Sequence, residues 1–317
     1  MMRPTPDKTV LVTGVDGFIG AHIANELAEL DYSVIGTFLE APSEPVEAWW
    51  STNRHRMITV PLDVSDKGAA QSILAMYQPA SVIHAAAVTD PSTGSLLTVN
   101  FEGAKNILGP ARPAAKVFVS SASVYTAAPP DGKDTPDRID EEAPVVPVPA
   151  RHADWTYAQS KRAAELWALA HGHIRIARVA ACFGPLERPT QNRTVMSIGH
   201  AAARAALESK RVEIESGVES DLTYVRDTAR GIIALLEADS PSSIVNIARS
   251  SVICGDCISR AANSAILGSP VDTVYLSLDT HRRPLNTQRL EAIRRDRDYE
   301  LVPAFEEYVR WLSAHEY

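Results

Sequence analysis

A glycine-rich turn near the N-terminus constrains the fold of this chain more than any other feature. A buried strand is expected at residues 8–13, and an amphipathic helix is expected from 18 to 30, with Gly14, Gly17 and Gly20 at their junction. Gly14 permits a tight turn, Gly17 lets the backbone approach a pyrophosphate, and Gly20 lets the helix pack closely on the strand. Phosphates would then lie at the helix N-terminus, among free N–H groups. The turn therefore predicts a dinucleotide site in preference to a purely structural turn.

Short apolar segments alternate with helical patterns along the first 180 residues. Such alternation predicts βαβ units and a parallel sheet with helices on both faces. We therefore expect an α/β fold, a doubly wound parallel sheet of the Rossmann type. Further strands are expected at 33–38, 57–60, 81–85, 116–120 and 174–180, and helices at 69–77, 96–108 and 157–171.

Beyond residue 181 the alternation weakens, which predicts a smaller C-terminal mixed α/β substrate domain against the carboxyl end of the sheet. Helices are expected at 194–209 and 227–238, strands at 211–215 and 243–247, and a charged amphipathic tail at 286–317. We assign residues 1–181 and 221–248 to the dinucleotide-binding domain, and residues 182–220 and 249–317 to the substrate domain.

Composition argues against several classes of protein. The 317 residues carry a formal net charge of -8, whereas nucleic-acid binders usually present a basic face. No apolar run approaches the roughly 18 to 20 residues that span a bilayer. Residues 1–8 are polar and contain prolines, unlike a secretory signal. We expect a cytoplasmic protein without a nucleic-acid or membrane partner.

The cysteines and histidines do not predict a metal site. Cys254 and Cys257 form one CxxC pair, and Cys182 is remote in sequence. A structural zinc site needs four ligands, and a redox dithiol would follow a strand near the start of its domain. His171 and His173 lack a third ligand at a suitable spacing. The cysteines are therefore expected to be buried or incidental.

Residues 126–149 are dense in prolines and acidic side chains, so they are expected to form a surface loop. A passive insertion and a lid over a site are equally compatible with this composition.

The spacing Gly-x-x-Gly-x-x-Gly resembles the form found in short-chain dehydrogenases/reductases, especially their extended branch, which includes the nucleotide-sugar epimerases. The resemblance covers most of the chain. It implies that Asp63 meets an adenine, that the segment from His84 to Ala87 lies along the cofactor, and that Asn100 is the asparagine of a central helix. The implied cofactor-binding residues are Gly14, Asp16, Gly17, Phe18, Ile19, Gly20, Asp63, Val64, Ala85, Ala86, Ala87, Tyr157 and Lys161.

Tyr157 and Lys161 lie four residues apart, on one face of a helix. A phenol has a reference pKa near 10, and a nearby ammonium together with a positive nicotinamide ring would favour the phenolate. Bringing that pKa close to neutrality corresponds to about 4 kcal/mol of differential stabilisation. Alone, such a pair can be surface packing. Its position after the fifth strand predicts Tyr157 as acid/base, with Lys161 holding the ribose and stabilising the phenolate.

The fifth strand ends in a serine-rich segment, at the edge where an open α/β sheet presents its chemistry. The family resemblance maps the catalytic serine to Ser121, which would orient the substrate hydroxyl while Tyr157 exchanges its proton. Ser123 is the reserve candidate, and Ser120 is expected to be buried against the sheet. The implied catalytic set is Ser121, Tyr157, Lys161 and Asn100.

The choice between NAD and NADP depends on the end of the second strand. An acid there accepts the ribose hydroxyls and repels a 2′-phosphate. Phe38 takes that place, with Glu40 two residues later, and Arg54 or Arg56 would have to fold back to meet a phosphate. NAD is favoured, and NADP remains possible.

Two positions depart from the nucleotide-sugar enzymes that the chain resembles. Ala181 stands where they usually carry an asparagine, and Ser220 where they tend to place an arginine. Both changes remove donors for a diphosphate. The favoured function is therefore an NAD(P)-dependent oxidoreductase that interconverts a secondary alcohol and a ketone or aldehyde on a small, possibly sugar-like substrate. The alternatives are a nucleotide-sugar epimerase/dehydratase with retained NAD and a non-catalytic NAD(P)-binding sensor.

Substrate contacts are expected from Thr89, Ser123 and Arg193, although Arg188, Asn192 and Arg193 could also be solvated loop residues. Members of the extended family are often homodimers joined through the helices that carry Asn100 and Tyr157. The resemblance therefore implies a homodimer, with a contact surface drawn from Leu96, Val99, Ala163, Leu166 and Trp167. The same stripe of residues is equally compatible with a place in the core.

Overall fold

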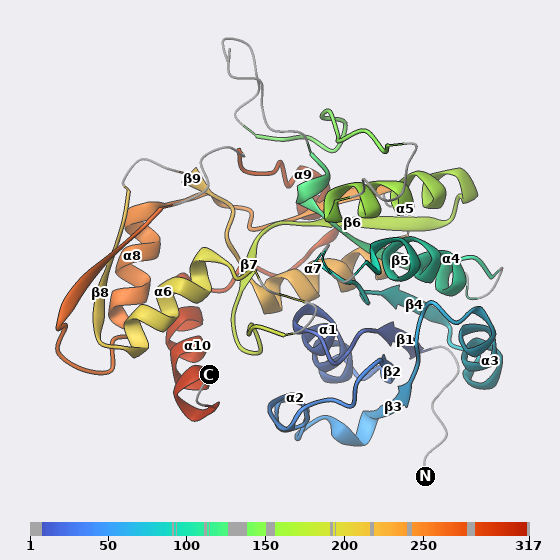
Figure 1. Cartoon of the computed structure of the whole chain (residues 1–317), viewed down its shortest axis with the longest axis horizontal. Helices are drawn as coiled ribbons and strands as arrows, with labels where there is room; N and C mark the ends of the chain where they lie inside the picture. The colour runs from blue at the N-terminus through green and yellow to red at the C-terminus, as the bar shows by residue number, and fades with distance from the viewer. Residues whose placement is uncertain are drawn as a thin grey trace.

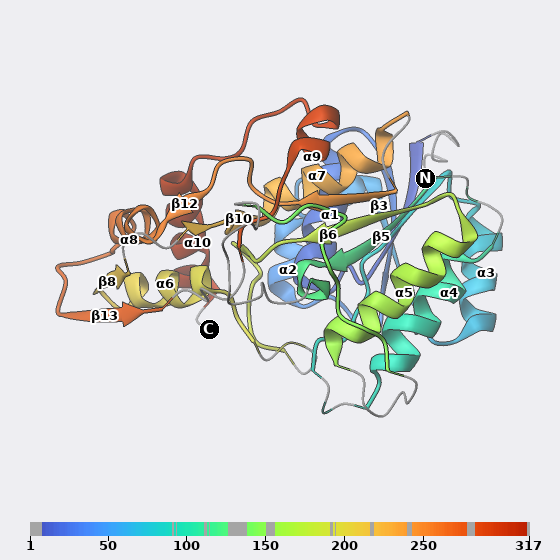
Figure 2. The same cartoon turned by 90° about the horizontal axis from the view of Figure 1, so that it is seen from above.

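A parallel sheet forms the larger lobe of the protein, seen here in a computed structural model (Figures 1 and 2). The structure describes residues 8–90, 92, 94–110, 113, 115–125, 138–149, 156–190, 193, 195–215, 219–239, 243–277 and 283–315. Within these residues the sheet has seven strands in the order β11-β6-β5-β4-β1-β2-β3. The strands are β1 (Thr9–Thr13), β2 (Ser33–Phe38), β3 (Met57–Pro61), β4 (Ser81–His84), β5 (Ala115–Ser121), β6 (Ile174–Val179) and β11 (Ile244–Ile247).

The strand order reverses direction between β1 and β4, which is the place where doubly wound sheets bind their ligands. Thr13, the last residue of β1, is level with Thr37 of β2 on one side and with His84 of β4 on the other. The carboxyl ends of the central strands therefore open a crevice at Thr13. This confirms the predicted doubly wound Rossmann sheet.

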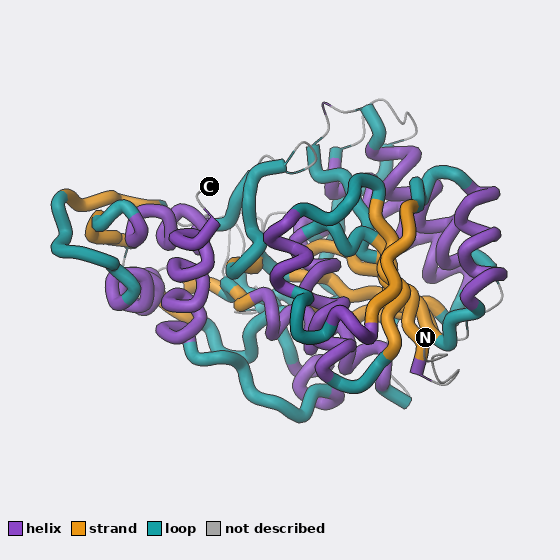
Figure 3. The backbone as a smooth tube through the Cα atoms, turned by 90° about the horizontal axis from the view of Figure 1, so that it is seen from below, coloured by secondary structure: helices purple, strands orange, loops and turns teal. Residues whose placement is uncertain are grey.

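Helices cover both faces of the sheet, as Figure 3 shows from below. Successive strand residues point to opposite faces, so Val10 and Val12 join one apolar core while Leu11 joins the other. The first face is covered by α1 (Phe18–Glu29), α2 (Glu44–Trp49) and α7 (Val225–Glu237). The second face is covered by α3 (Lys67–Tyr77), α4 (Gly103–Leu108) and α5 (Tyr157–His171).

Helix α1 meets α7 although the two are far apart in the chain. Arg226 and Arg230 of α7 both bind the buried carboxylate of Glu26 of α1, with N–O distances of 2.5 and 2.7 Å. Glu26 and Arg226 are separated by 200 residues. A buried carboxylate stabilises a fold only when it is paired, so these arginines fix α7 on α1.

A second, smaller lobe lies beside the sheet (Figure 1). It contains α6 (Ile198–Leu207), β8 (Lys210–Ile214), α8 (Gly255–Ser264), β13 (Asp272–Leu276) and α10 (Leu301–His315), and β8 pairs with β13 in parallel. Two short strand pairs join it to the sheet, β7 (Cys182–Phe183) with β10 (Thr223–Tyr224) and β9 (Glu219–Ser220) with β12 (Ile253–Cys254). Helix α9 (Gln288–Ile293) instead packs on α7 and β11. The division at residues 181/182, 220/221 and 248/249 stays a prediction.

The helix expected at residues 96–108 is not one regular α-helix. It begins as a π-helix, η4 (Leu96–Glu102), and continues as α4. Single-turn π segments often occur at functional sites. Asn100 lies in this wider turn, where its side chain bonds the backbone of Val88 in the loop after β4. Residues 126–137 of the expected surface loop lie outside the described residues.

Residues 138–149 of that loop are docked on the sheet. Arg178 of β6 donates from Nη1 to the carbonyl of Glu141 at 2.9 Å, and Asn246 of β11 donates to the carbonyl of Ile139 at 3.0 Å. The backbone N–H of Asn246 in turn donates to Glu141 Oε1 at 2.9 Å. This described part is therefore anchored across β6 and β11.

Candidate active site

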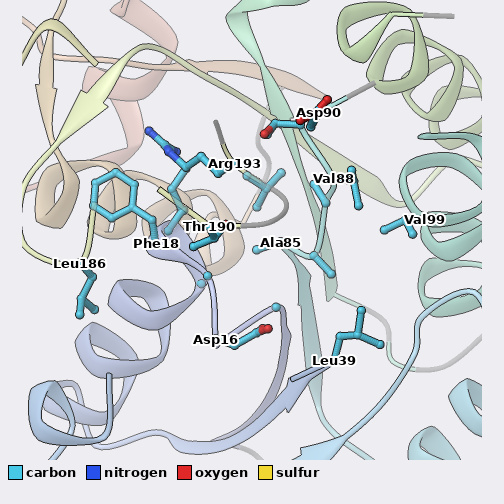
Figure 4. Close-up of a pocket in the computed structure, with 18 of the residues that line it drawn as sticks. Asp16, Phe18, Leu39, Ala85, Val88, Asp90, Val99, Leu186, Thr190 and Arg193 are labelled. Atoms are coloured by element: carbon cyan, nitrogen blue, oxygen red, sulfur yellow. The ribbon is translucent and has the colours of Figure 1, made fainter. Parts of the chain in front are cut away.

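A cleft of about 700 Å³ opens at the carboxyl ends of β1, β4, β5 and β6. Figure 4 shows some of the side chains that line it. The lining includes every predicted site residue except Asn100 and Ser123. The predicted residues therefore form part of this wall, and they include the glycine turn, Thr89 and Arg193.

The glycine turn leaves no room for side chains. Gly14 has a φ of +71°, and a Cβ built there would lie 2.7 Å from the Cα of Ala86. At Gly20 a Cβ would lie 2.1 Å from the carbonyl oxygen of Gly14. Helix α1 then begins at Phe18 after Gly17, which provides no side-chain cap. The first amides of α1 can therefore bind a phosphate, and the cradle fits a dinucleotide.

A buried pair holds the loop after β4 against this turn. Thr13 Oγ1 accepts hydrogen bonds from the backbone N–H groups of Ala85 and Ala86, both at 3.1 Å. It lies 2.8 Å from Nδ1 of His84, so its own proton is donated to that nitrogen. Burial, aided by the charge of Lys161, lowers the pKa of His84 to about 3 and keeps the ring neutral. Sequence reasoning missed Thr13, because a threonine inside a buried strand is usual.

At the end of β2 a carboxylate is present, but it comes from the glycine turn. The backbone amides of Leu39 and Glu40 stabilise the carboxylate of Asp16, which faces Leu39 in Figure 4. Burial nevertheless raises the pKa of Asp16, and the charge of Glu40 adds to the rise. The Asp16 carboxylate thus lies at the end of β2, where Phe38 stands at the position of the expected acid.

Neither Arg54 nor Arg56 folds back toward this end of the cleft. Arg54 Nε binds Glu47 at 3.0 Å and its Nη1 donates to the carbonyl of Met57. Arg56 binds Asp31 at 2.6 Å. Asp63, which lines the cleft nearby, accepts the N–H and the hydroxyl of Ser65.

The predicted catalytic tyrosine and serine lie together at the other end of the cleft. The Ser121 hydroxyl hydrogen-bonds Tyr157, and it also receives the N–H and the hydroxyl of Ser123, at 3.2 and 2.9 Å. Ser123 is exposed and does not line the cleft. The reserve candidate is therefore a partner of Ser121 at the surface.

Lys161 is buried beneath the tyrosine. Its Nζ donates to the carbonyl of Val119 at 2.9 Å and lies 5.9 Å from the centre of the Tyr157 ring. Burial lowers the pKa of Lys161 to about 7, although Glu165 opposes the change.

The polypeptide alone does not produce the expected low pKa at Tyr157. Burial raises the pKa of Tyr157 to about 12, against the hydrogen bond from Ser121 and the charge of Arg193, which both lower it. The expectation that the Lys161 ammonium lowers this pKa is thus not met within the chain itself. Desolvation has the largest effect on this pKa, and the cation whose charge lowers it is Arg193.

A buried ionic platform lies under the end of β5. Glu165 of α5 binds Arg178 of β6 through two N–O contacts of 2.9 and 2.8 Å, and it accepts the Ser120 hydroxyl at 2.6 Å. All three side chains are buried, so Ser120 lies against the sheet as expected. The platform holds α5 to β5 and β6, and thereby keeps Tyr157 beside Ser121.

Asn100 acts from behind the wall of the cleft. Its side chain accepts the N–H of Val88, donates to the carbonyl of Val88, and donates to the hydroxyl of Ser160 on α5, at 2.8, 2.8 and 2.9 Å. The residue is fully buried. Asn100 does not line the cleft, and its place in the catalytic set stays a prediction.

Arg193 is held over the cleft by a buried acid that the sequence did not reveal. Its Nη2 binds Glu187 at 2.8 Å, and its guanidinium lies 5.1 Å from the centre of the Phe18 ring (Figure 4). Glu187 also receives the N–H and hydroxyl of Ser197, both at 2.8 Å. The Nε of Arg193 is buried and has no hydrogen-bond partner among the described residues. Asn192, the neighbouring candidate, lies outside the described residues.

Ala181 and Ser220 are the two positions at which the sequence departs from the nucleotide-sugar enzymes that it resembles. Ala181 lines the cleft and offers no side-chain donor, while its carbonyl accepts the N–H of Thr223 at 3.0 Å. Ser220 lies on β9, away from the lining residues, and its hydroxyl accepts the N–H of Leu222.

The described residues contain neither a metal-binding cluster nor a membrane-spanning helix. They hold no group of three or more histidine, cysteine or acidic side chains that could bind a metal ion. In the same part of the chain, no helix combines the length and apolar character needed to cross a membrane.

The family model of the NAD-dependent epimerase/dehydratase family matches residues 10–248. The chain belongs to this family. The match confirms the resemblance to extended short-chain dehydrogenases/reductases, and it confirms NAD as the cofactor at the level of the family.

Within the epimerase/dehydratase family, the curated relatives carry the names of nucleotide-sugar enzymes. A UDP-N-acetyl-alpha-D-glucosaminuronate decarboxylase of Bacillus cytotoxicus is 25% identical over 255 residues, covering 76% of this chain and 74% of the relative. A UDP-glucuronate 4-epimerase 3 of Arabidopsis thaliana is 27% identical over 263 residues, covering 74% of this chain. The chain matches 56% of the length of this plant enzyme.

Solved structures of the epimerase/dehydratase type share the fold. A dTDP-glucose 4,6-dehydratase of Bacillus anthracis in complex with NAD has a TM-score of 0.76 at 19% identity and covers 97% of both chains. A UDP-glucuronic acid 4-epimerase of Bacillus cereus in complex with UDP-glucuronic acid and NAD has a TM-score of 0.73 at 19% identity, over 97% of this chain and 99% of its own. At these identities the likeness shows the fold alone.

Proposed function

We propose that this member of the family is an NAD-dependent enzyme that oxidises a secondary hydroxyl of a nucleotide-linked acidic sugar and keeps its cofactor through the catalytic cycle. The observation that carries the proposal is the meeting of Ser121, Tyr157 and Arg193 at one end of the cleft. The names of the relatives favour this function over net oxidation of a small alcohol, and they favour an enzyme over a non-catalytic sensor.

The catalytic work of the chain itself is a proton transfer. Bound NAD supplies the hydride acceptor. The Tyr157 oxygen takes the proton of the substrate hydroxyl, while Ser121 holds the same hydroxyl oxygen in place. Burial raises the pKa of the phenol, and the charge of Arg193 opposes that rise and so favours the proton-accepting form. Lys161, fixed by the Val119 carbonyl beneath the tyrosine, would hold the ribose of the cofactor.

Arg193 is the proposed partner of the acidic group of the substrate. Glu187 occupies only one of its terminal nitrogens, and its buried Nε has no partner among the described residues. A carboxylate that takes two N–H groups of a guanidinium forms a strong, oriented pair. Both relatives described above are named for uronate sugars, which carry such a carboxylate.

A second candidate function is net dehydrogenation of a small hydroxy acid. Ala181 and Ser220 favour it, because the Ala181 side chain has no donor and Ser220 does not line the cleft. Arg193 would serve the carboxylate of either substrate, so the arginine does not separate the two functions.

Retention of NAD and the redox balance of the reaction separate the two candidates. The purified protein is denatured, the released dinucleotide is quantified, and the native protein is then incubated with UDP-linked uronates and with small sugar acids. We expect about one NAD per chain and a redox-neutral conversion of a UDP-uronate, detected by mass spectrometry without accumulating NADH. Steady NADH production from a small hydroxy acid would support the second function. Tyr157→Phe is the control, and undiminished turnover in a folded variant would refute the site.

A further inference from the structure

Cys254 and Cys257 lie together at the start of α8, in the smaller lobe. Cys254 is the residue that precedes the helix, and Cys257 lies in its first turn. Their sulfur atoms are 2.9 Å apart, and both side chains are only partly buried. A disulfide requires about 2.05 Å between sulfurs, so the two atoms need to approach by about 1 Å.

The backbone around this pair is held firmly. A Cβ built on Gly255 would lie 2.2 Å from the carbonyl oxygen of Glu215, so the helix begins in close contact with the segment that follows β8. On the other side, Cys254 belongs to β12 and is paired with Glu219 of β9. The two thiols are thus preorganised by contacts outside the CxxC sequence.

The electrostatic surroundings favour a thiolate. The N-terminus of α8 attracts negative charge, and Arg260, one turn later, donates from Nη2 to Cys257 Sγ at 3.2 Å. Hydrogen bonds from the Cys257 side chain and backbone lower the pKa of Cys254, although Asp256 opposes them. Cys182 differs, because burial raises its pKa to about 12. The third cysteine is therefore an internal reference for an unreactive thiol.

Metal binding does not explain the pair, since no third histidine, cysteine or acid joins the two sulfurs in the part of the chain that is described. We propose that Cys254 and Cys257 form a reversible intramolecular disulfide by exchange with a low-molecular-weight disulfide of the glutathione class. The site is separate from the cleft and does not depend on the proposed function.

The exchange proceeds in two balanced steps. The Cys254 thiolate attacks one sulfur of the small disulfide, forms a mixed disulfide, and expels one thiolate. The Cys257 thiolate then attacks the Cys254 sulfur, closes the intramolecular bond, and expels the second thiolate. The two protons released by the protein thiols end on the two small thiols, so the protein pair is oxidised as the small disulfide is reduced.

Equilibration of the whole protein in buffers of reduced and oxidised glutathione tests the proposal. The thiols are then trapped with an alkylating reagent, and the intact mass and the non-reduced peptides are measured. We expect Cys254 and Cys257 to lose their alkylation together and the protein to lose two hydrogens, while Cys182 remains a thiol. Dithiothreitol should restore both thiols.

Three variants sharpen this experiment. Cys254→Ser and Cys257→Ser should each stop at a single glutathione adduct, and Cys182→Ala should still close the disulfide. The proposal is overturned if the wild-type pair stays alkylatable in excess oxidised glutathione, or if it accumulates two glutathione adducts. Protection of both thiols by zinc with no disulfide would overturn it too. If a serine variant fails to fold, the wild-type peptide map still decides.

Discussion

The hydroxyl oxygen of Thr13 and Nδ1 of His84 lie 2.8 Å apart where β1 and β4 end. The same oxygen receives the amides of Ala85 and Ala86. One buried hydroxyl therefore ties the glycine turn, the loop after β4 and a neutral imidazole into a single wall of the cleft.

Replacing Thr13 by valine keeps the shape of the side chain and removes this hydroxyl. Two amides and a ring nitrogen then lose their partner, and each buried unsatisfied group costs about 1 to 3 kcal/mol. We expect a lower Tm and weaker NAD binding, measured by calorimetry. Thr37→Val is the matched control, because Thr37 is level with Thr13 on β2 and its buried hydroxyl oxygen has no partner in the described structure. Equal effects of the two substitutions would contradict the assignment.

Lys161 makes stability depend on pH. Its pKa is lowered to about 7, whereas an unfolded lysine titrates near 10.4. Between these values the unfolded chain binds more protons, so stability rises with pH, and below pH 7 the full cost of the buried ammonium is present. Lys161→Met should flatten this rise, by a difference on the order of 4 kcal/mol across the window. Urea unfolding from pH 6 to 10 measures it, and parallel curves for both proteins would refute the buried charge.

Arg193→Met retains the packing on Phe18 and removes the charge. An acidic substrate should then bind about 10- to 100-fold more weakly, as expected for a lost charged hydrogen bond. The pH at which the rate rises as Tyr157 loses its proton should also move upward, because Arg193 lowers the pKa of Tyr157. Steady-state kinetics against pH measure both changes. Arg204→Met is the control, since Arg204 pairs with Glu208 on the surface of α6. An unchanged KM would exclude Arg193 from substrate binding.

Asp16 is expected to discriminate between the two nicotinamide cofactors. Its carboxylate, together with Glu40, places negative charge at the end of β2, where a 2′-phosphate would lie. Asp16→Asn should shift the ratio of NADP to NAD affinity by about tenfold in favour of NADP, which corresponds to about 1.4 kcal/mol. Binding titrations with both dinucleotides measure this ratio. Asp63→Asn serves as the comparison. If Asp16→Asn leaves the ratio of NADP to NAD affinity unchanged, residues other than Asp16 discriminate between the two cofactors.

The sheet and most helices were predictable because local signals define them. Apolar runs marked the strands, and α5 begins where a capping box forms, with Thr156 and Gln159 each bonded to the other's backbone. Helix α2 was missed because it is short and buries only Val46, and α8 was missed because its first turn contains glycine and cysteine. No residue of strand β13 is fully buried, and its apolar run is only three residues long, from Val274 to Leu276.

The candidate site was predictable in its residue types but not in its electrostatics. Spacing placed Tyr157 and Lys161 on one helix face, yet it could not show that burial raises the pKa of Tyr157 and lowers that of Lys161. The pairing of Arg193 with Glu187 depends on how a loop folds, and no periodicity reports it. The homodimer expected through the helices that carry Asn100 and Tyr157 stays a prediction. Leu166, one of its expected contact residues, is 47% exposed.

The ion pairs between Glu26 of α1 and the two arginines of α7 also bear on how the chain folds during synthesis. A ribosome that has translated only the first 181 residues has made β1 through β6 but not the helix that covers α1. Ile23 and Leu27 of α1 belong to the same apolar core as Ile232 and Ile233 of α7. The core on this face of the sheet therefore stays incomplete until the chain has been synthesised through α7.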